Sequence, residues 1–101
     1  MEPVMITISH NLGKAEVVRR MRPVLAKAAA SFPILTVEQE VWEGDRMTFR
    51  VRALGQSVVG TVEVFESSVR LEIRLPWLLA RSLGVIRETI VRQGQVLLGK
   101  K

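Results

Sequence analysis

The sequence predicts an α+β fold with two layers, in which two amphipathic helices cover one face of a five-stranded antiparallel sheet. Between Gly44 and Leu75, apolar and polar residues alternate in three consecutive runs, and this period of two gives each strand one buried and one solvent-facing side. Two other segments space their apolar residues as a helix does. These helices must cover the dry face of the sheet. Because the chain has 101 residues, we expect a single domain, residues 1–101.

The first elements are a strand from about Pro3 to Ser9 and a helix from about Gly13 to Ser31. The apolar stripe of this helix consists of Val18, Met21, Leu25, Ala28 and Phe32. Pro23 removes one backbone hydrogen bond inside the helix and crowds the preceding turn. We therefore expect a kink near Arg19–Arg22, or two abutting short helices.

Four strands follow, and the short turns between them predict a meander. The expected strands are Leu35–Glu43, Arg46–Ala53, Ser57–Val64 and Val69–Leu75, and the expected spatial order of all five strands is 1-5-4-3-2.

The charges test the register of these strands. Val64 opposite Val69 places Glu63 opposite Arg70 on the wet face. We expect four apolar residues of the second and third strands to share the dry face: Val37, Val41, Phe49 and Val51. In this register Glu38 and Glu40 lie near Arg50 and Arg52. Trp42 and Phe65 then lie on the wet face. Gly60 is expected to let the last helix approach the sheet, or to mark a bulge.

The last element is a helix from Pro76 to about Leu98, because proline suits the first helical position. Its apolar stripe is Leu79, Leu83, Ile86, Ile90 and Leu97, flanked by Trp77, Leu78 and Val91. We expect Gly84 to allow close approach to the sheet and Gly94 to mark fraying. The order β–α–β–β–β–β–α, with a long last helix across a curved sheet, resembles a shortened helix-grip arrangement.

Composition narrows the classes of function. The chain has no cysteine, which excludes disulfides and thiolate metal sites. The net charge of +5 attracts anionic surfaces, but the basic residues are spread over helices and sheet, so nucleic acid is not an expected partner. The longest apolar region, Leu75 to Ile86, contains Arg81 and is too short to span a bilayer. We therefore expect a cytoplasmic protein without a transmembrane segment.

The sequence indicates no catalytic, cofactor-binding or metal-ligating residues and no cofactor. His10 is the one histidine, at the junction of the first strand and the first helix. It is a candidate ligand contact beside a helix N-terminus, and the alternative is a loop histidine that satisfies backbone groups. Without a neighbouring serine motif or acidic pair, the second interpretation is favoured, and we expect a protein that is not an enzyme.

The main candidate for surface binding is the last helix, which is basic and amphipathic and has an aromatic residue at its start. Its candidate residues are Trp77, Leu78, Arg81, Arg87 and Arg92. The alternative is that the same apolar stripe only covers the sheet.

Three segments, ISHNLGKAEVVRRM, WEGDRMTFRVRALGQSVVGTVEV and VRLEIRLPWLLA, resemble the polyhydroxyalkanoic acid system family, which is encoded near polyester storage genes. The resemblance covers most of the chain. It implies a role in the synthesis, mobilisation or surface organisation of polyhydroxyalkanoate granules in a bacterial cytoplasm. It carries no catalytic residues to this chain, and the sheet-rich pattern differs from the long helices of phasins.

Three functions of different classes remain open. The first is a non-enzymatic accessory protein that docks on granules or on a granule-associated protein. The second is a small carrier that holds an apolar or acyl ligand between helix and sheet. The third is a nucleic-acid-binding regulator, for which the net charge is the one argument. A homodimer formed by pairing of edge strands is a further possibility.

Overall fold

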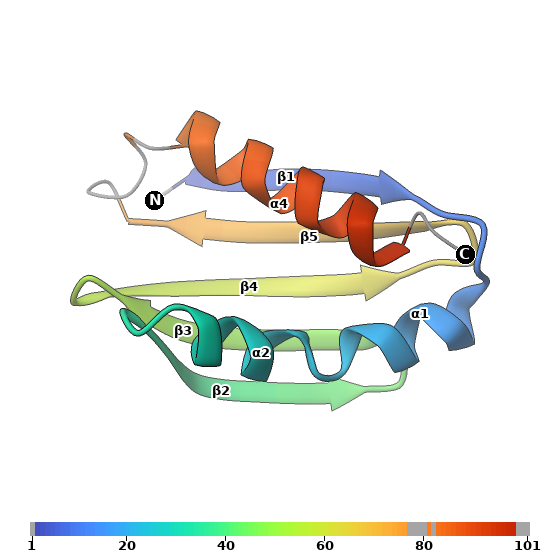
Figure 1. Ribbon diagram of the computed structural model, residues 1–101, viewed down its shortest axis with the longest axis horizontal. Helices are drawn as coiled ribbons and strands as arrows, with labels where there is room; N and C mark the ends of the chain where they lie inside the picture. Colours follow the sequence, from blue (N-terminus) through green and yellow to red (C-terminus); the bar gives the residue numbers. More distant parts are fainter. Residues whose placement is uncertain (1, 77–80, 82, 99–101) are drawn as a thin grey trace.

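The computed structural model describes residues 2–76, 81 and 83–98 (Figure 1). Its elements are β1 (Glu2–Ser9), α1 (Lys14–Met21), α2 (Val24–Ser31), β2 (Leu35–Glu43), β3 (Arg46–Ala53), β4 (Gln56–Val64), β5 (Ser68–Leu75) and α4 (Leu83–Leu98). The five strands form one antiparallel sheet in the order β1-β5-β4-β3-β2. The predicted α+β class and the predicted strand order are both confirmed.

The predicted pairing of β4 with β5 is confirmed, because Val64 lies opposite Val69 and Glu63 lies opposite Arg70. The predicted register of β2 is wrong beyond Val37, where a bulge at Glu38 shifts the pairing. A one-residue shift moves every following side chain to the other face of the sheet. Trp42 therefore packs on the helix side of the sheet against a buried cluster, whereas Val41 is exposed.

The same bulge changes the partners of the two glutamates. Glu38 reaches Arg52, as predicted, with 2.8 Å between Oε2 and Nη2. Glu40 instead lies opposite Phe49, and its Oε2 accepts a hydrogen bond of 2.8 Å from Nε1–H of Trp42.

Pro23 divides the predicted first helix into α1 and α2, which confirms the expectation of two abutting short helices. The last N–H bond of α1 runs from Arg22 to the carbonyl of Val18, at 3.1 Å. Most of the predicted apolar stripe is confirmed, since Val18, Met21 and Leu25 pack against a buried cluster. It is wrong at Phe32, which is exposed, and it omits Val17, which is fully buried. α2 ends at Ser31, and the backbone of Phe32 is extended, so the helical period no longer applies at this residue.

The beginning of α4 also differs from the prediction. The described helix begins at Leu83, and Arg81 lies in a turn before it. The predicted positions Trp77, Leu78 and Leu79 lie outside the described residues. From Ile86 onward the predicted stripe is confirmed, since Ile86, Ile90 and Leu97 pack against the buried clusters, and the flanking Val91 packs there as well.

The helical layer is closed at one end and open at the other. α1 contacts both α4 and β4, while α2 lies over β2 and α4 over β1, so the helices diverge across the sheet (Figure 1). At the closed end, Nη1 of Arg20 donates a hydrogen bond of 2.8 Å to the carbonyl oxygen of Leu97. Val17 and Leu98 are buried in the same cluster there.

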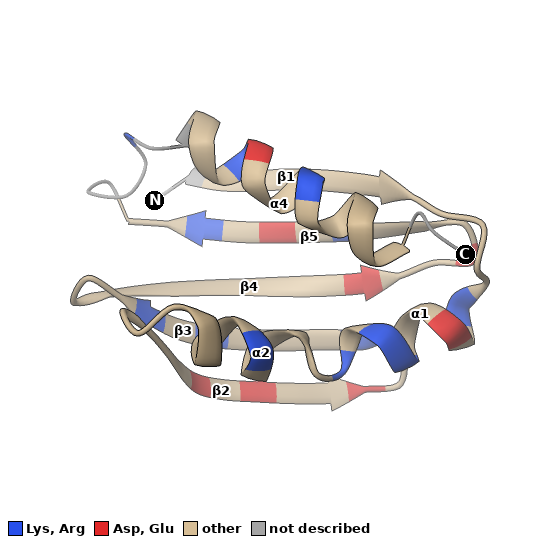
Figure 2. Ribbon diagram, viewed as in Figure 1, with Lys and Arg blue, Asp and Glu red and all other residues tan. Residues whose placement is uncertain are grey.

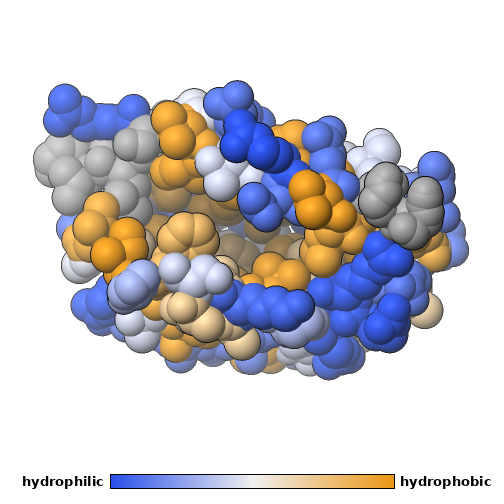
Figure 3. All heavy atoms as spheres, viewed as in Figure 1, coloured by the Kyte–Doolittle hydropathy of each residue, from blue (hydrophilic) through white to orange (hydrophobic). Residues whose placement is uncertain are grey.

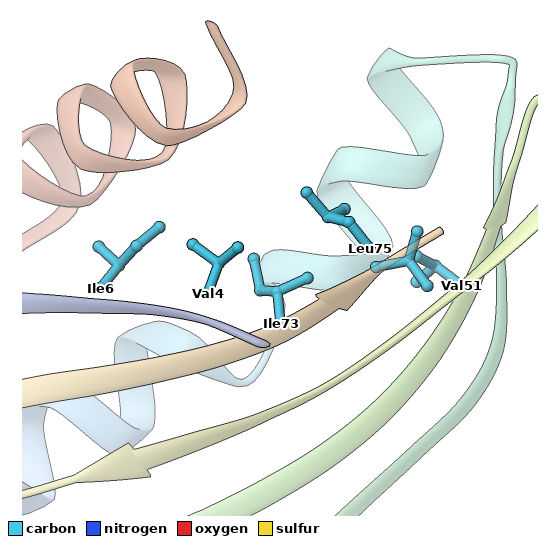
Figure 4. Close-up of a cluster of buried hydrophobic side chains, with 6 residues drawn as sticks. Val4, Ile6, Val51, Ile73 and Leu75 are labelled. Carbon is cyan, nitrogen blue, oxygen red and sulfur yellow. The ribbon is translucent and has the colours of Figure 1, made fainter. Parts of the chain in front are cut away.

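The buried core forms two clusters that follow this division. One contains Val4 and Ile6 of β1, Ile73 and Leu75 of β5, Val51 of β3 and Val58 of β4, and most of these side chains project to the helix side in Figure 4. The other contains Val17, Met47, Val62, Val64, Val69 and Leu98. Phe49 and Leu71 are partly buried and pack against both clusters, so they join the two halves of the core.

The glycines differ from their predicted roles. A Cβ at Gly60 would lie 2.5 Å from the Phe49 ring and 2.7 Å from the carbonyl oxygen of Glu72, so an aromatic ring, and not the last helix, lies over this position. At Gly94, α4 lies close to β1, since a Cβ there would overlap the side chain of Ile8. No atom of the described residues lies within 4 Å of a Cβ at Gly84, so the close approach predicted there occurs at Gly94 instead, inside a helix that continues to Leu98.

We expect Gly60→Ala to lower the free energy of unfolding by about 2 kcal/mol, because the added methyl meets a backbone oxygen that cannot move without disturbing the sheet. The matched control is Gly84→Ala, which should be neutral or raise the free energy by up to about 1 kcal/mol, since it adds helix propensity in open space. Urea denaturation followed by circular dichroism measures both. Equal stability of the two variants would contradict this account of Gly60.

Candidate functional site

An exposed apolar surface lies at the open end of the helical layer. It consists of Phe32, Ile34 and Leu54, which are 58%, 59% and 62% exposed, and we call it the apolar end surface. Leu35 pairs with Ala53 at the end of the ladder, and Ile34 and Leu54 are the next residues beyond that pair on the two strands. The amide of Leu35 donates to the carbonyl of Phe32 at 2.9 Å, which holds Phe32 in the same turn. Three large apolar side chains are thus gathered on loops.

Leu54 is unusual in its backbone as well as in its exposure. It has a φ of 55°, and it is followed by Gly55 at 75°. Two consecutive residues with positive φ suit a tight hairpin turn, but asparagine, aspartate or glycine are the residues that adopt this conformation at low cost. A leucine in this conformation lowers the stability of the fold and exposes an apolar side chain to water. Backbone strain at a residue other than glycine is typical of functional positions.

Between α2 and α4 the apolar surface is incompletely covered. Figure 3 shows a hollow between the two helices, with hydrophobic residues on both sides of it. Leu25 of α2 and Ile86 and Ile90 of α4 pack against the buried cluster but remain partly exposed. α2 has no buried residue, although most of its residues are apolar. We call this region the helix groove, and it opens toward the end of the molecule that carries the α2–β2 link and the β3–β4 turn.

The predicted arginines of α4 have different environments. Arg81 is exposed in the turn before α4. Nη1 of Arg87 donates a hydrogen bond of 3.2 Å to the carbonyl oxygen of Met5, so this side chain covers part of the edge of β1. Arg92 lies one turn after Glu88, with 3.6 Å between Nη2 and Oε2, and both side chains are largely exposed. Trp77 and Leu78 lie outside the described residues.

The open face of the sheet holds Phe65 but not Trp42. Phe65 is exposed, as predicted, and the guanidinium carbon of Arg70 lies 5.3 Å from the centroid of its ring. Trp42 lies on the helix side, where Arg22 lies 5.1 Å from its ring centroid. The two aromatic residues therefore do not share one face.

His10 is buried, and its hydrogen bonds join the β1–α1 link to the β4–β5 link. Its N–H donates to the carbonyl of Ser67 at 3.0 Å, and its Nδ1 accepts from the N–H of Leu12 at 3.1 Å. Because Nδ1 accepts, the proton lies on Nε2, which donates to the carbonyl of Phe65 at 3.1 Å. Both ring nitrogens are engaged in this tautomer. A role for His10 as a ligand contact stays a prediction, and it requires one of these bonds to break.

Charged groups surround the beginning of α1. The carboxylate of Glu16 accepts hydrogen bonds from Arg19 at 2.5 Å and from Arg20 at 2.8 Å, and these partners lower the pKa of Glu16 to about 2. Nζ of Lys14 lies 2.9 Å from Asp45, which raises the pKa of Lys14 and lowers that of Asp45. A shallow hollow of about 880 Å³ lies here, but the carboxylates that line it, Glu16, Asp45 and Glu66, disfavour an anion.

These features together define a small α+β protein with an open antiparallel sheet, an incompletely covered apolar layer and an apolar end surface. Within the described ranges, no helix is long and apolar enough to cross a membrane. The chain belongs to the family described as "Putative polyhydroxyalkanoic acid system protein", whose model matches residues 4–98. This match confirms the resemblance seen in the sequence. Searches of curated proteins and of solved structures find no match.

Sequence reasoning missed the apolar end surface. The available signal was Leu54 in the turn Leu54–Gln56, since a large apolar residue in a hairpin turn is uncommon. The periodicity places Phe32 on a buried stripe, and it assigns no role to Ile34. Both residues lie beyond the end of α2, where the backbone of Phe32 is extended and the helical period no longer applies.

We expect His10→Ala to lower the free energy of unfolding by about 2 kcal/mol or more, because it leaves the N–H of Leu12 and the carbonyl of Phe65 without their partner. His10→Asn should lose less, since the Asn carbonyl oxygen can still accept from the amide two residues on. Urea denaturation compares both variants with the wild type. Wild-type stability of His10→Ala would show that these bonds contribute nothing measurable.

Stability should depend on pH through Glu16. Its pKa is lowered in the folded state, so its stabilising contribution is complete above the ordinary value of 4.5 and is lost as the pH falls through about 2. Asp45 acts in the same direction. The free energy of unfolding is measured from neutral pH down to about 2 for the wild type and Glu16→Gln, and the advantage of the wild type should vanish at the acid end and shrink in high salt. A constant difference across this range would refute the assignment.

Proposed function

We propose that this protein is a non-enzymatic accessory protein of polyhydroxyalkanoate storage that docks on the surface of the polyester granule in the cytoplasm. The family supports the setting. The observation that carries the docking is the apolar end surface, where Leu54 is exposed in a strained backbone conformation beside Phe32 and Ile34. These side chains can leave water by packing against the apolar polyester. Such burial contributes about 25 cal/mol of binding free energy per Å² of apolar area.

The positions of the basic residues support docking through this same end of the molecule. The end of β5 and the beginning of α4 lie at the same end of the molecule as the α2–β2 link and the β3–β4 turn (Figure 1). Arg81 precedes α4, and the candidates Trp77 and Leu78 belong to the same connection in sequence. We propose that Arg81, with Arg87 and Arg92 farther along the helix, attracts acidic groups at the granule surface, while the apolar end surface makes the lasting contact.

The test is co-sedimentation of the purified protein with polyester granules, comparing the wild type with Leu54→Asn. Asparagine adopts the positive φ of this position more readily than leucine, so the variant should fold with equal or greater stability. It should nevertheless bind several-fold more weakly, because the apolar side chain is gone. Weaker binding without a loss of stability separates docking from folding. If Leu54 had only a structural role, binding would change in the same direction as stability.

Val96→Gln is the matched control. Val96 is 68% exposed near the end of α4, on the part of the helix that contacts α1, and it should retain wild-type binding. Trp77→Ala and Arg81→Glu test the remaining candidates, and the effect of Arg81→Glu should shrink in high salt. Protein that stays in solution with granules at low salt would rule out direct docking.

A second function, a carrier for an apolar or acyl ligand, is favoured by the helix groove. Leu25, Ile86 and Ile90 leave apolar surface partly exposed between α2 and α4, and such a lining suits an alkyl chain. The granule experiment distinguishes the two functions. Binding that is unchanged in Leu54→Asn but is reduced in Ile90→Gln would assign the interaction to the groove.

A further inference from the structure

The face of the sheet opposite the helices carries a depression of about 390 Å³ over β3, β4 and β5. Its shape follows from the lengths of the side chains. Along β4, between β3 and β5, Ser57, Val59 and Thr61 on this face are short, and Val59 and Thr61 line the depression; the longer Glu63 follows them near the end of the strand. Glu63 is the one charged residue of β4, whereas β3 carries three arginines and β5 carries Arg70, Glu72 and Arg74 (Figure 2). The longer side chains of β3 and β5 therefore rise on both sides of a low central strand.

The charges around this depression are unbalanced. Arg46 and Arg50 of β3 and Arg74 of β5 line it, together with one carboxylate, Glu72. Arg46 has Glu63 opposite it in register, so the excess of positive charge lies at Arg50 and Arg74. Arg50 and Arg74 both pair in register with Val59, from opposite sides. Two strand spacings separate them, about 10 Å, so their guanidinium groups can reach one ligand between them.

The arginines of this face differ in how they are neutralised. Arg52, which does not line the depression, has Glu38 at 2.8 Å. Arg74 has Glu72 at a looser 3.7 Å. The cross-strand neighbours of Arg50 are Gln39 and Val59, which are uncharged, and no ion pair of Arg50 occurs within the described ranges. The positive charge of Arg50 thus faces the depression without a carboxylate to neutralise it.

We propose that this depression binds a small carboxylate anion, with Arg50 and Arg74 as its anchors. A guanidinium group matches a carboxylate by two parallel N–H···O bonds, which makes arginine the preferred partner for this group. The hydroxyls of Thr48 and Thr61 line the floor beside them and can donate or accept. Val59 offers apolar contact to a short aliphatic chain.

Glu72 refines the class of ligand. A second negative charge on the ligand would lie close to this carboxylate, so a phosphate dianion is disfavoured. A hydroxyl on the ligand can instead donate to Glu72. The depression therefore fits a short hydroxycarboxylate. This choice of ligand rests on the proposed function for its natural source: a free hydroxyalkanoic acid and the carboxylate end of a polyester chain share this chemistry.

The experiment is an NMR titration of the full chain with hydroxybutyrate, a short hydroxybutyrate oligomer, butyrate and inorganic phosphate as separate probes. Hydroxybutyrate should shift the amide signals of Val59, Thr61 and Thr48 with saturation, and it should bind more tightly than phosphate. Arg50→Gln should weaken this binding about tenfold, while Arg52→Gln, the matched control on the same face, should leave it unchanged. Spectra of the free variants verify that each remains folded.

The other probes and one further variant test which molecule is the natural source of the carboxylate, and why hydroxybutyrate is preferred over phosphate. Tighter binding of the oligomer supports the chain end as the natural ligand, and equal binding supports the free acid. Glu72→Gln should reduce the preference for hydroxybutyrate over phosphate. Absence of saturable shifts, equal affinity in Arg50→Gln and Arg52→Gln, or stronger binding of phosphate to the wild type would overturn the proposal. The titration contains no granules, so its failure and the failure of granule docking are independent results.

Discussion

The contact between α1 and the end of α4 is the constraint on which the rest of the structure depends. Arg20 donates to the carbonyl of Leu97, one of the last carbonyls of α4, which have no partner within the helix, while Val17 and Leu98 are buried beside it. This contact fixes two helices to each other over one end of the sheet. Because α2 then lies over β2 while α4 lies over β1, these two helices diverge, and the helix groove opens toward the apolar end surface.

β4 determines the properties of both faces of the sheet. On the helix side, the absence of a side chain at Gly60 lets the Phe49 ring lie over the strand, where it joins the two halves of the core. On the opposite side, Val59 and Thr61 leave a low strip between strands that carry arginines. One strand of small residues thus accommodates an aromatic ring on one face and forms a polar depression on the other, so the two faces offer different chemistry to different ligands.

The sequence predicted the element order, the strand order and the break at Pro23, because each depends on local properties of the chain. Alternation shows which residues form strands, short turns make consecutive strands neighbours, and a proline interrupts a helix wherever it occurs. It failed at Phe32, Val41 and Trp42, where the end of a helix or a bulge shifted the phase of an otherwise regular pattern, and it omitted Val17, which adjoins the predicted stripe in α1. Such a shift costs little locally, so the pattern on either side of it does not reveal it.

The sequence by itself therefore determined the α+β class, the antiparallel meander, the family and the excess of basic residues. The tertiary structure decided the divergence of the helices, the exposure of Phe32, Ile34 and Leu54, and the position of Arg50 beside a strand of short side chains. The physical reason is that periodicity records which side of its own element a residue occupies, whereas a binding surface depends on how far one element lies from the next. That distance is set by contacts between residues far apart in the chain, such as Arg20 with Leu97 and Gly94 with Ile8.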